Sequence, residues 1–255
     1  MTLNLYSTMA DRYNNNSQKI RVLTEHWVNE YIYCPNCGSR ILEYENNRPV
    51  ADFYCSKCNE DYELKSKKNR LGKKIVDGAY ATMIKRLQSD SNPNFFFLNY
   101  DKISLEIINF FVVPKYFFVP EIIERRKPLS PLARRAGWIG CNILLNTIPD
   151  SGKIFYIKNG EKESKDKILD NWHKTNFLKK ITTLQSKGWL LDIIKCIDKL
   201  NRNNFTLLDI YQFEKSLRLK HPENNNIQAK IRQQLQFLRD KGYLEFKSRG
   251  KYRLR

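Results

Sequence analysis

Residues 48–65 read RPVADFYCSKCNEDYELK, and this stretch places one acid, Asp52, upstream of a Glu-x-Lys triplet at Glu63 and Lys65. In a β-strand, residues 63 and 65 point to one face, while Leu64 points to the other. Two carboxylates can hold a hard divalent cation such as Mg²⁺. Such a cation polarises a phosphate and helps to make hydroxide from water. The stretch therefore predicts a phosphodiesterase centre in which Lys65 orients the water or offsets charge on phosphorus.

A pattern of paired cysteines, C-x2-C-x17-C-x2-C, surrounds the first acid and comprises Cys34, Cys37, Cys55 and Cys58. This spacing is typical of a structural Zn²⁺ site, and four thiolates leave no open position for a catalytic metal. The alternative is a set of free thiols. Residues 50–55 and 61–66 alternate as two strands would, so the second cysteine pair would form the turn of a hairpin. Zinc would then fix the register that sets Asp52 and Glu63 on one face. Cys141 and Cys196 lie in apolar surroundings, and we expect both in the core.

The charge of the chain indicates a polyanionic partner. Its 255 residues carry 45 Lys and Arg against 27 Asp and Glu, a formal net charge of +18, for which nucleic acid is the first candidate. A soluble basic protein without such a role is the alternative. Because the sequence contains neither a run of 18 apolar residues nor an export signal, we expect no membrane association and a cytoplasmic location. In a reducing compartment, metal ligation is favoured over disulfides.

Helices and strands alternate through the first 180 residues. The patterns predict helices over 17–31 and 75–87, strands over 95–98, 107–113 and 153–157, and a loop over 128–141. The charged segment 161–174 is interpreted as solvated surface or a boundary. This order predicts an α/β domain with a mixed sheet over residues 1–180.

A different pattern begins near residue 185 and predicts a second domain over residues 181–255. Apolar spacing predicts helices over 189–200, 206–220 and 226–241, followed by a basic hairpin with strands at 243–246 and 252–254. Three helices and a hairpin are the order of a winged helix-turn-helix. Residues 185–255 carry 16 Lys and Arg against 7 Asp and Glu, a net charge of +9.

The third helix and the wing supply candidate DNA contacts. Amide and guanidinium groups read base edges in the major groove, and basic groups of a wing suit phosphates. The candidates on the helix are Gln228, Arg232 and Gln233, and those on the wing are Lys247, Arg249, Lys251 and Arg253. A winged fold can instead dock on protein, and the glutamines could form a plain solvated face.

Six stretches of the sequence resemble one family, the DpnI-type methyl-directed restriction endonucleases. They are residues 46–55, 63–68, 77–83, 92–98, 133–142 and 240–253. The likeness runs from about Ser17 to the end of the chain, and 155–180 diverges. It implies a PD-(D/E)xK nuclease core with an inserted zinc finger, followed by a winged helix. It also implies Mg²⁺-dependent cleavage of duplex DNA at G-A-T-C carrying N6-methyladenine.

The resemblance assigns roles by position. Asp52, Glu63 and Lys65 match the family's catalytic set, with the two acids holding Mg²⁺, and the four paired cysteines match its zinc finger. Pro49 stands three residues before Asp52 instead of directly before it, which loosens the core signature.

Trp138 is the candidate sensor of the adenine methyl group. Methylation removes one N–H donor and adds a methyl in the major groove, so an aromatic surface suits its detection. Gly137 and Gly140 flank the tryptophan, and Arg134 and Arg135 precede it as candidate phosphate contacts. The alternative is a core aromatic residue.

Two other functions fit parts of the sequence. A zinc-ribbon and winged-helix regulator would bind DNA without cutting it, although it gains nothing from an acid beside DNA phosphates. A repair or Holliday-junction nuclease would prefer branched or damaged DNA. The three histidines are scattered and receive no role. The sequence leaves the oligomeric state open and indicates no obligate protein partner.

Overall fold

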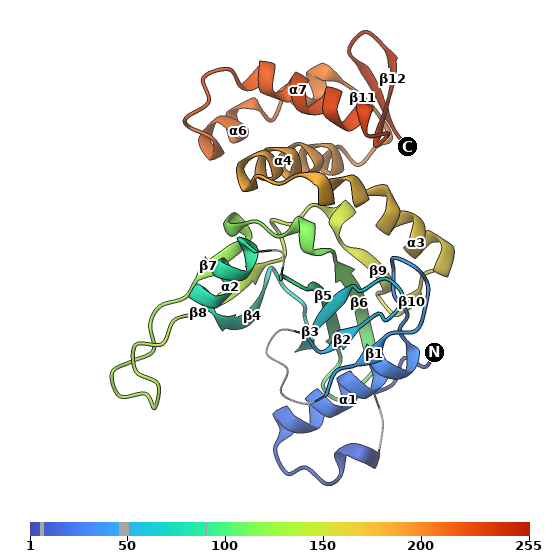
Figure 1. Ribbon diagram of the computed structural model, residues 1–255, viewed down its shortest axis with the longest axis vertical. Helices are drawn as coiled ribbons and strands as arrows, with labels where there is room; N and C mark the ends of the chain where they lie inside the picture. The colour runs from blue at the N-terminus through green and yellow to red at the C-terminus, as the bar shows by residue number, and fades with distance from the viewer. Residues whose placement is uncertain (6–7, 46–50, 90) are drawn as a thin grey trace. The chain divides into compact units, whose positions relative to one another are not determined.

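A computed structural model describes residues 1–5, 8–45, 51–89 and 91–255 (Figure 1). They form two compact units. Unit 1 comprises Met1–Thr147 and Lys153–His173, and unit 2 comprises Ile148–Gly152 and Lys174–Arg255. Short 3-10 helices occur at η1 (Thr8–Ala10), η2 (Lys115–Phe117), η3 (Pro120–Ile122), η4 (Asp150–Gly152) and η5 (Asn176–Lys180). The boundary at residue 180 remains a prediction about separately folding domains.

A seven-stranded sheet with the order β1-β2-β3-β5-β6-β9-β10 is the centre of unit 1. Its strands are β1 (Leu42–Glu43), β2 (Phe53–Tyr54), β3 (Asp61–Lys68), β5 (Asn94–Tyr100), β6 (Ile107–Val113), β9 (Ile154–Lys158) and β10 (Glu161–Lys162). β3 and β5 run parallel, and the other neighbours are antiparallel. The predicted mixed α/β fold is confirmed.

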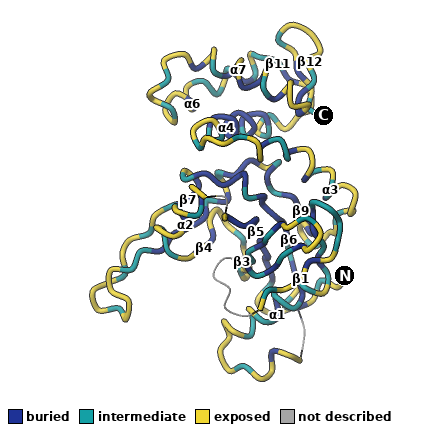
Figure 2. Tube along the Cα trace, in the orientation of Figure 1, coloured by how far each residue is buried: buried dark blue, intermediate teal, exposed yellow. Residues whose placement is uncertain are grey.

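The aromatic run of β5 explains why this strand is central. Every residue of β5 is buried, as expected for a strand covered on both faces, and the strand is drawn in the buried colour in Figure 2. On one face, Phe96 packs in a core that includes Trp27 and Val28 of α1 (Asn16–Tyr31). Phe95 and Phe97 alternate to the opposite face. The predicted first helix is therefore confirmed, and it covers one face of the sheet.

A second, three-stranded sheet with the order β4-β8-β7 corrects the prediction of one helix over 75–87. Its strands are β4 (Lys74–Ala79), β7 (Ile123–Arg125) and β8 (Gly140–Leu144), and helix α2 spans only Tyr80–Leu87. Along β4, Ile75 and Asp77 are buried while Val76 and Gly78 are exposed. This two-residue alternation and the pairing with β8 outweighed the helical spacing of the apolar residues.

Segment 161–174 is more ordered than its charge suggested. After β10, helix α3 (Lys165–Lys174) buries Ile168 and Trp172. The indole Nε1 of Trp172 donates to Asn36 Oδ1 at 3.1 Å, and the ring packs near Tyr116. The interpretation as solvated surface was wrong, because two apolar anchors are enough to dock a helix whose other face is charged.

Unit 2 has the element order of a winged helix. Its helices are α4 (Leu184–Leu200), α5 (Leu207–Tyr211), α6 (Glu214–Lys220) and α7 (Ile227–Asp240), and its strands are β11 (Asn204–Thr206), β12 (Leu244–Ser248) and β13 (Lys251–Leu254). The sheet order is β11-β13-β12. Thr206 and Asp209 form a capping box at the start of α5. The single helix predicted over 206–220 is instead two short helices.

Candidate active site and metal centre

The four paired cysteines form a compact cluster. Their sulfur atoms all lie within 4.8 Å of one another, with Cys34 Sγ 3.4 Å from Cys58 Sγ and Cys37 Sγ 3.5 Å from Cys55 Sγ. Tetrahedral zinc with Zn–S bonds of about 2.3 Å needs sulfurs roughly 3.8 Å apart. The cluster can therefore hold a metal such as zinc.

Both cysteine pairs have the same backbone turn. The amide of Gly38 donates to the Cys34 carbonyl, and the amide of Asn59 donates to the Cys55 carbonyl, each at 2.8 Å. Gly38 and Asn59 have φ values of 70° and 56°, a conformation that glycine and asparagine adopt most readily. The hydroxyl of Tyr62 lies 3.1 Å from Cys34 Sγ and can donate a hydrogen bond to a thiolate there.

The β2–β3 hairpin brings the two candidate metal-binding acids close together. Phe53 pairs with Tyr62, and the preceding residue, Asp52, also donates its amide to the Tyr62 carbonyl at 2.9 Å. Asp52 therefore lies just before the paired residues, next to Glu63 on the neighbouring strand, and the two carboxylates repel each other electrostatically. One carboxylate oxygen of Asp52 accepts from the Leu64 amide at 2.6 Å. β2 is shorter than the predicted strand over 50–55, of which Val50 lies outside the described residues together with Pro49.

Glu63 and Lys65 belong to a row of four side chains with alternating charge. Lys65 Nζ lies 2.5 Å from Glu63 Oε1 and 2.5 Å from Asp77 Oδ1. The second oxygen of Glu63 accepts from Arg86 Nη2 at 2.7 Å. Asp77 comes from β4 and Arg86 from α2, so the row joins β3 to the segment that follows it.

Burial and neighbouring charge set the protonation of this centre. Burial raises the pKa of Asp52, the Glu63 carboxylate adds to the rise, and the Leu64 amide and Lys65 oppose it. Burial alone would lower the pKa of Lys65, but Glu63 and Asp77 outweigh it and raise the pKa. Lys65 is thus held as an ammonium, while Asp52 carries a charge that a cation would stabilise.

Asp77 and Arg86 were missed from the sequence. The prediction of a helix over 75–87 gave neither residue a reason to face β3. The signal that could have identified Asp77 was a lone acid between Ile75 and Ala79 in an alternating stretch. A buried acid in a strand needs a cation beside it. Lys65, already a candidate catalytic residue, could supply that cation.

Trp138 and its two arginines lie on the long connection between β7 and β8, which extends away from the rest of unit 1 (Figure 1). The Leu129 amide donates to the Trp138 carbonyl at 2.9 Å, so the connection closes as a hairpin. Arg134 and Arg135 are exposed and Trp138 is half-buried. The Arg135 guanidinium lies 4.6 Å from the centroid of the Trp138 ring, a cation–π contact. Trp138 is therefore a surface aromatic residue and not part of the core.

In unit 2 the predicted contact residues lie on the exposed parts of α7 and the wing. Gln228, Arg232 and Gln233 are exposed on α7, whereas Gln234 is buried. Gln228 donates to Glu214 at 2.7 Å, and Arg232 to the Tyr211 hydroxyl at 2.6 Å. The wing residues Lys247, Arg249, Lys251 and Arg253 are all exposed.

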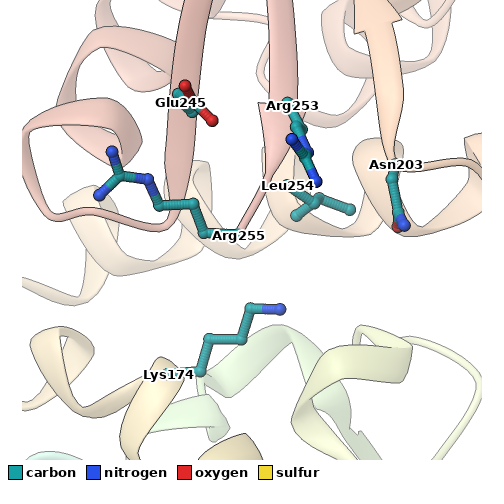
Figure 3. A pocket seen from close by; sticks show the side chains of 6 residues that line it. All are labelled: Lys174, Asn203, Glu245, Arg253, Leu254 and Arg255. Carbon is teal, nitrogen blue, oxygen red and sulfur yellow. The ribbon is translucent and has the colours of Figure 1, made fainter.

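A surface pocket at the base of the wing is also basic. It is lined by Lys174, Asn203, Glu245, Arg253, Leu254 and Arg255 (Figure 3). All six residues belong to unit 2. The pocket extends the positive surface of the wing beyond Arg253.

Comparison with protein families accounts for both units. Residues 1–181 match the DpnI family, described as the Dam-replacing family. The chain belongs to the Dam-replacing family. Residues 185–254 match the Dam-replacing HTH domain. The two matches support a Dam-methylation-dependent restriction enzyme, and the helix-turn-helix domain indicates DNA binding.

The same matches bear out the resemblance seen in the sequence. In the described part of the chain, no helix has both the length and the apolar character needed to cross a bilayer.

Proposed function

We propose that this member of the Dam-replacing family is a Mg²⁺-dependent type II site-specific deoxyribonuclease of the PD-(D/E)xK class. Its substrate is duplex DNA at G-A-T-C sequences whose adenine carries an N6-methyl group. The observation that carries the proposal is the closeness of the Asp52 and Glu63 carboxylates, with the Lys65 ammonium 2.5 Å from Glu63. A DNA-binding regulator would gain nothing from such acids.

Asp52 and Glu63 would hold the Mg²⁺ ion. They offer carboxylate oxygens, the ligands that this ion prefers, and the raised pKa of Asp52 reports burial and a neighbouring carboxylate that a cation would offset. When bound, the ion would polarise the scissile phosphate and favour loss of a proton from water. Lys65 would orient the attacking water or balance charge on phosphorus, and Arg86 would keep Glu63 aimed at the centre.

Two surfaces would read the DNA. In unit 1, the apolar indole of Trp138 would contact the adenine methyl in the major groove, with Arg134 and Arg135 on phosphates. In unit 2, the exposed Gln228, Arg232 and Gln233 of α7 would reach base edges. The basic wing residues Lys247, Arg249, Lys251 and Arg253 would hold phosphates. Each surface would recognise the methylated sequence on its own.

A digest of one plasmid, prepared with and without adenine methylation, tests this function. We expect cutting of the methylated plasmid only, in Mg²⁺ and not in EDTA. Asp52→Ala should abolish cutting and keep binding of methylated duplex. Asp170→Asn, which removes an exposed acid from α3, is the matched control and should cut normally. Cutting of both plasmids would remove methyl dependence, and binding without cutting would assign the protein to the regulators.

A further inference from the structure

Asp77 is a buried acid whose partner is the candidate catalytic lysine. Its side chain is only 5% exposed, and its Oδ1 atom lies 2.5 Å from Lys65 Nζ. A carboxylate that is this far removed from water needs a paired cation. Asp77 lies on the three-stranded sheet, whereas Asp52 and Glu63 lie on the seven-stranded sheet.

Lys65 lies between two carboxylates, those of Glu63 and Asp77, that have different roles. Glu63 contacts Lys65 and Arg86 at once, and in the proposed function it also has to bind Mg²⁺. Once its charge is shared with the ion, Glu63 attracts Lys65 less strongly. Asp77 lies on a separate strand, β4, and its carboxylate contacts Lys65. It therefore does not share its charge with the ion and keeps its full attraction for Lys65.

We propose that Asp77 is a positioning residue that holds the Lys65 ammonium in place while Glu63 is engaged with the metal. This inference rests on the proposed nuclease function and adds a residue to it. Asp77 would act through Lys65 and would touch neither the metal nor the DNA.

The backbone around Asp77 is built to keep this side chain fixed. Asp77 pairs with Cys141 of β8, and a bulge between Asp77 and Ala79 turns the strand into α2. The buried Cys141 donates to the Gly78 carbonyl at 3.4 Å. Since β8 also ends the Trp138 hairpin, the strand that supports Asp77 is continuous with the proposed methyl-reading loop.

The first test compares wild type, Asp77→Asn and Asp77→Glu, with Asp170→Asn as the control for loss of one acid. Single-turnover cleavage of a methylated duplex in Mg²⁺ should slow about 10²-fold in Asp77→Asn, the effect of a reacting group misplaced by about 1 Å. The affinity for the same duplex in EDTA should not weaken. Asp77→Glu, which keeps the charge, should recover part of the rate.

The second test does not depend on activity. Urea unfolding midpoints are measured for Asp77→Asn, Lys65→Met and the double variant. Lys65→Met leaves the buried Asp77 carboxylate without its cation, and Asp77→Asn removes one of the two carboxylates that contact Lys65. The double variant should therefore lose less than the sum of the two. Additive losses would show that the two side chains do not act together, and would overturn the inference.

The outcomes separate this inference from the proposed function. If wild type and Asp77→Asn both cut at the wild-type rate, Asp77 does not position Lys65 and only the inference fails. If wild type cuts neither plasmid, the proposed function fails and the inference fails with it. A weaker duplex affinity that accounts for the whole loss of rate would also overturn the positioning role.

Discussion

Removal of zinc is expected to abolish cleavage, because the hairpin that carries Asp52 cannot hold its register alone. β2 contains only Phe53 and Tyr54, and the second cysteine pair forms the turn that connects it to β3. Asp52 precedes β2 directly, so its position near Glu63 depends on this short strand.

The expected size of the zinc effect follows from the cost of ordering this segment. Ordering the ten residues 52–61 costs at least about 10 kcal/mol. Beside the β2–β3 ladder, hydrogen bonds such as Asp52 N to Tyr62 O, Tyr44 N to Asp52 O and Asn94 Nδ2 to Asp61 O each contribute about 1 kcal/mol. Structural zinc supplies about 10–16 kcal/mol, as much as the whole ordering cost, so its removal takes away the largest single stabilising contribution to the hairpin.

The assay uses protein stripped of zinc by a zinc-selective chelator and then supplied with excess Mg²⁺. Metal analysis should find one zinc per chain before treatment. We expect cutting of methylated plasmid to disappear and to return when zinc is restored. Cys37→Ser should behave like the stripped protein, and Cys196→Ser, which removes a buried thiol outside the cluster, should retain its zinc.

Wild-type cutting by zinc-free protein would show that zinc is not needed to place Asp52. It would mean that packing of Phe53 and Tyr62 alone sets the register of Asp52. Loss of DNA binding by unit 2 in the same sample would show that zinc stabilises the whole chain and not the hairpin alone, which would also contradict the prediction.

Three further predictions concern packing and charge. Trp172→Ala should destabilise unit 1 by about 3–5 kcal/mol in urea unfolding, and Trp172→Phe should cost less, since it loses mainly the bond to Asn36. Gly140→Ala places a Cβ 2.8 Å from the Trp138 ring, so it should change tryptophan fluorescence and reduce the preference for methylated over unmethylated duplex, with unchanged non-specific binding. Burial raises the pKa of Asp198 despite bonds from Ser151. A raised pKa favours the folded state at acidic pH, so the stability of wild type relative to Asp198→Asn should fall as pH rises above the ordinary aspartate value of about 3.9, and a difference that does not depend on pH would contradict it.

Those parts of the fold that are encoded by strong local patterns were predictable from the sequence. The aromatic run at 95–98 predicted a strand buried on both faces, and α1 and α7 followed from apolar spacing. The cysteine spacing predicted a compact four-thiol cluster. The hairpin between Asp52 and Glu63 followed from alternation combined with that spacing, although the strand before Cys55 is shorter than expected.

The errors came from segments whose structure depends on distant partners. Residues 75–79 form a strand because β8, more than sixty residues later, supplies the pairing, and no local pattern contains that information. Trp172 is buried because its indole donates a hydrogen bond to Asn36 and its ring packs near Tyr116. Both errors concealed contacts of the candidate sites. The helix predicted over 75–87 contained Asp77, and the segment 161–174, interpreted as surface, contacts Asn36 of the first cysteine pair.

The charge of the candidate centre explains how a chain with net charge +18 could still need a metal to cut DNA. Asp52, Glu63 and Asp77 face Lys65 and Arg86, so the ionised centre has one excess negative charge. A phosphate about 5 Å away would be repelled by about 3 kcal/mol at an effective dielectric constant of about 20. Mg²⁺ reverses the sign of the centre.

This reversal predicts a link between metal and DNA affinity that is separate from catalysis. Lys65→Ala keeps both proposed metal-binding acids and should cut slowly, so its Kd for methylated duplex can be measured with and without Mg²⁺. We expect Mg²⁺ to tighten binding at least about a hundredfold, because the loss of Lys65 raises the excess negative charge to two and a repulsion of at least about 3 kcal/mol is removed. The same comparison in Lys65→Ala combined with Asp52→Ala should show little tightening. Equal tightening in both proteins would assign the effect to metal bound elsewhere, and would contradict the proposal that Asp52 and Glu63 admit the phosphate only with a cation.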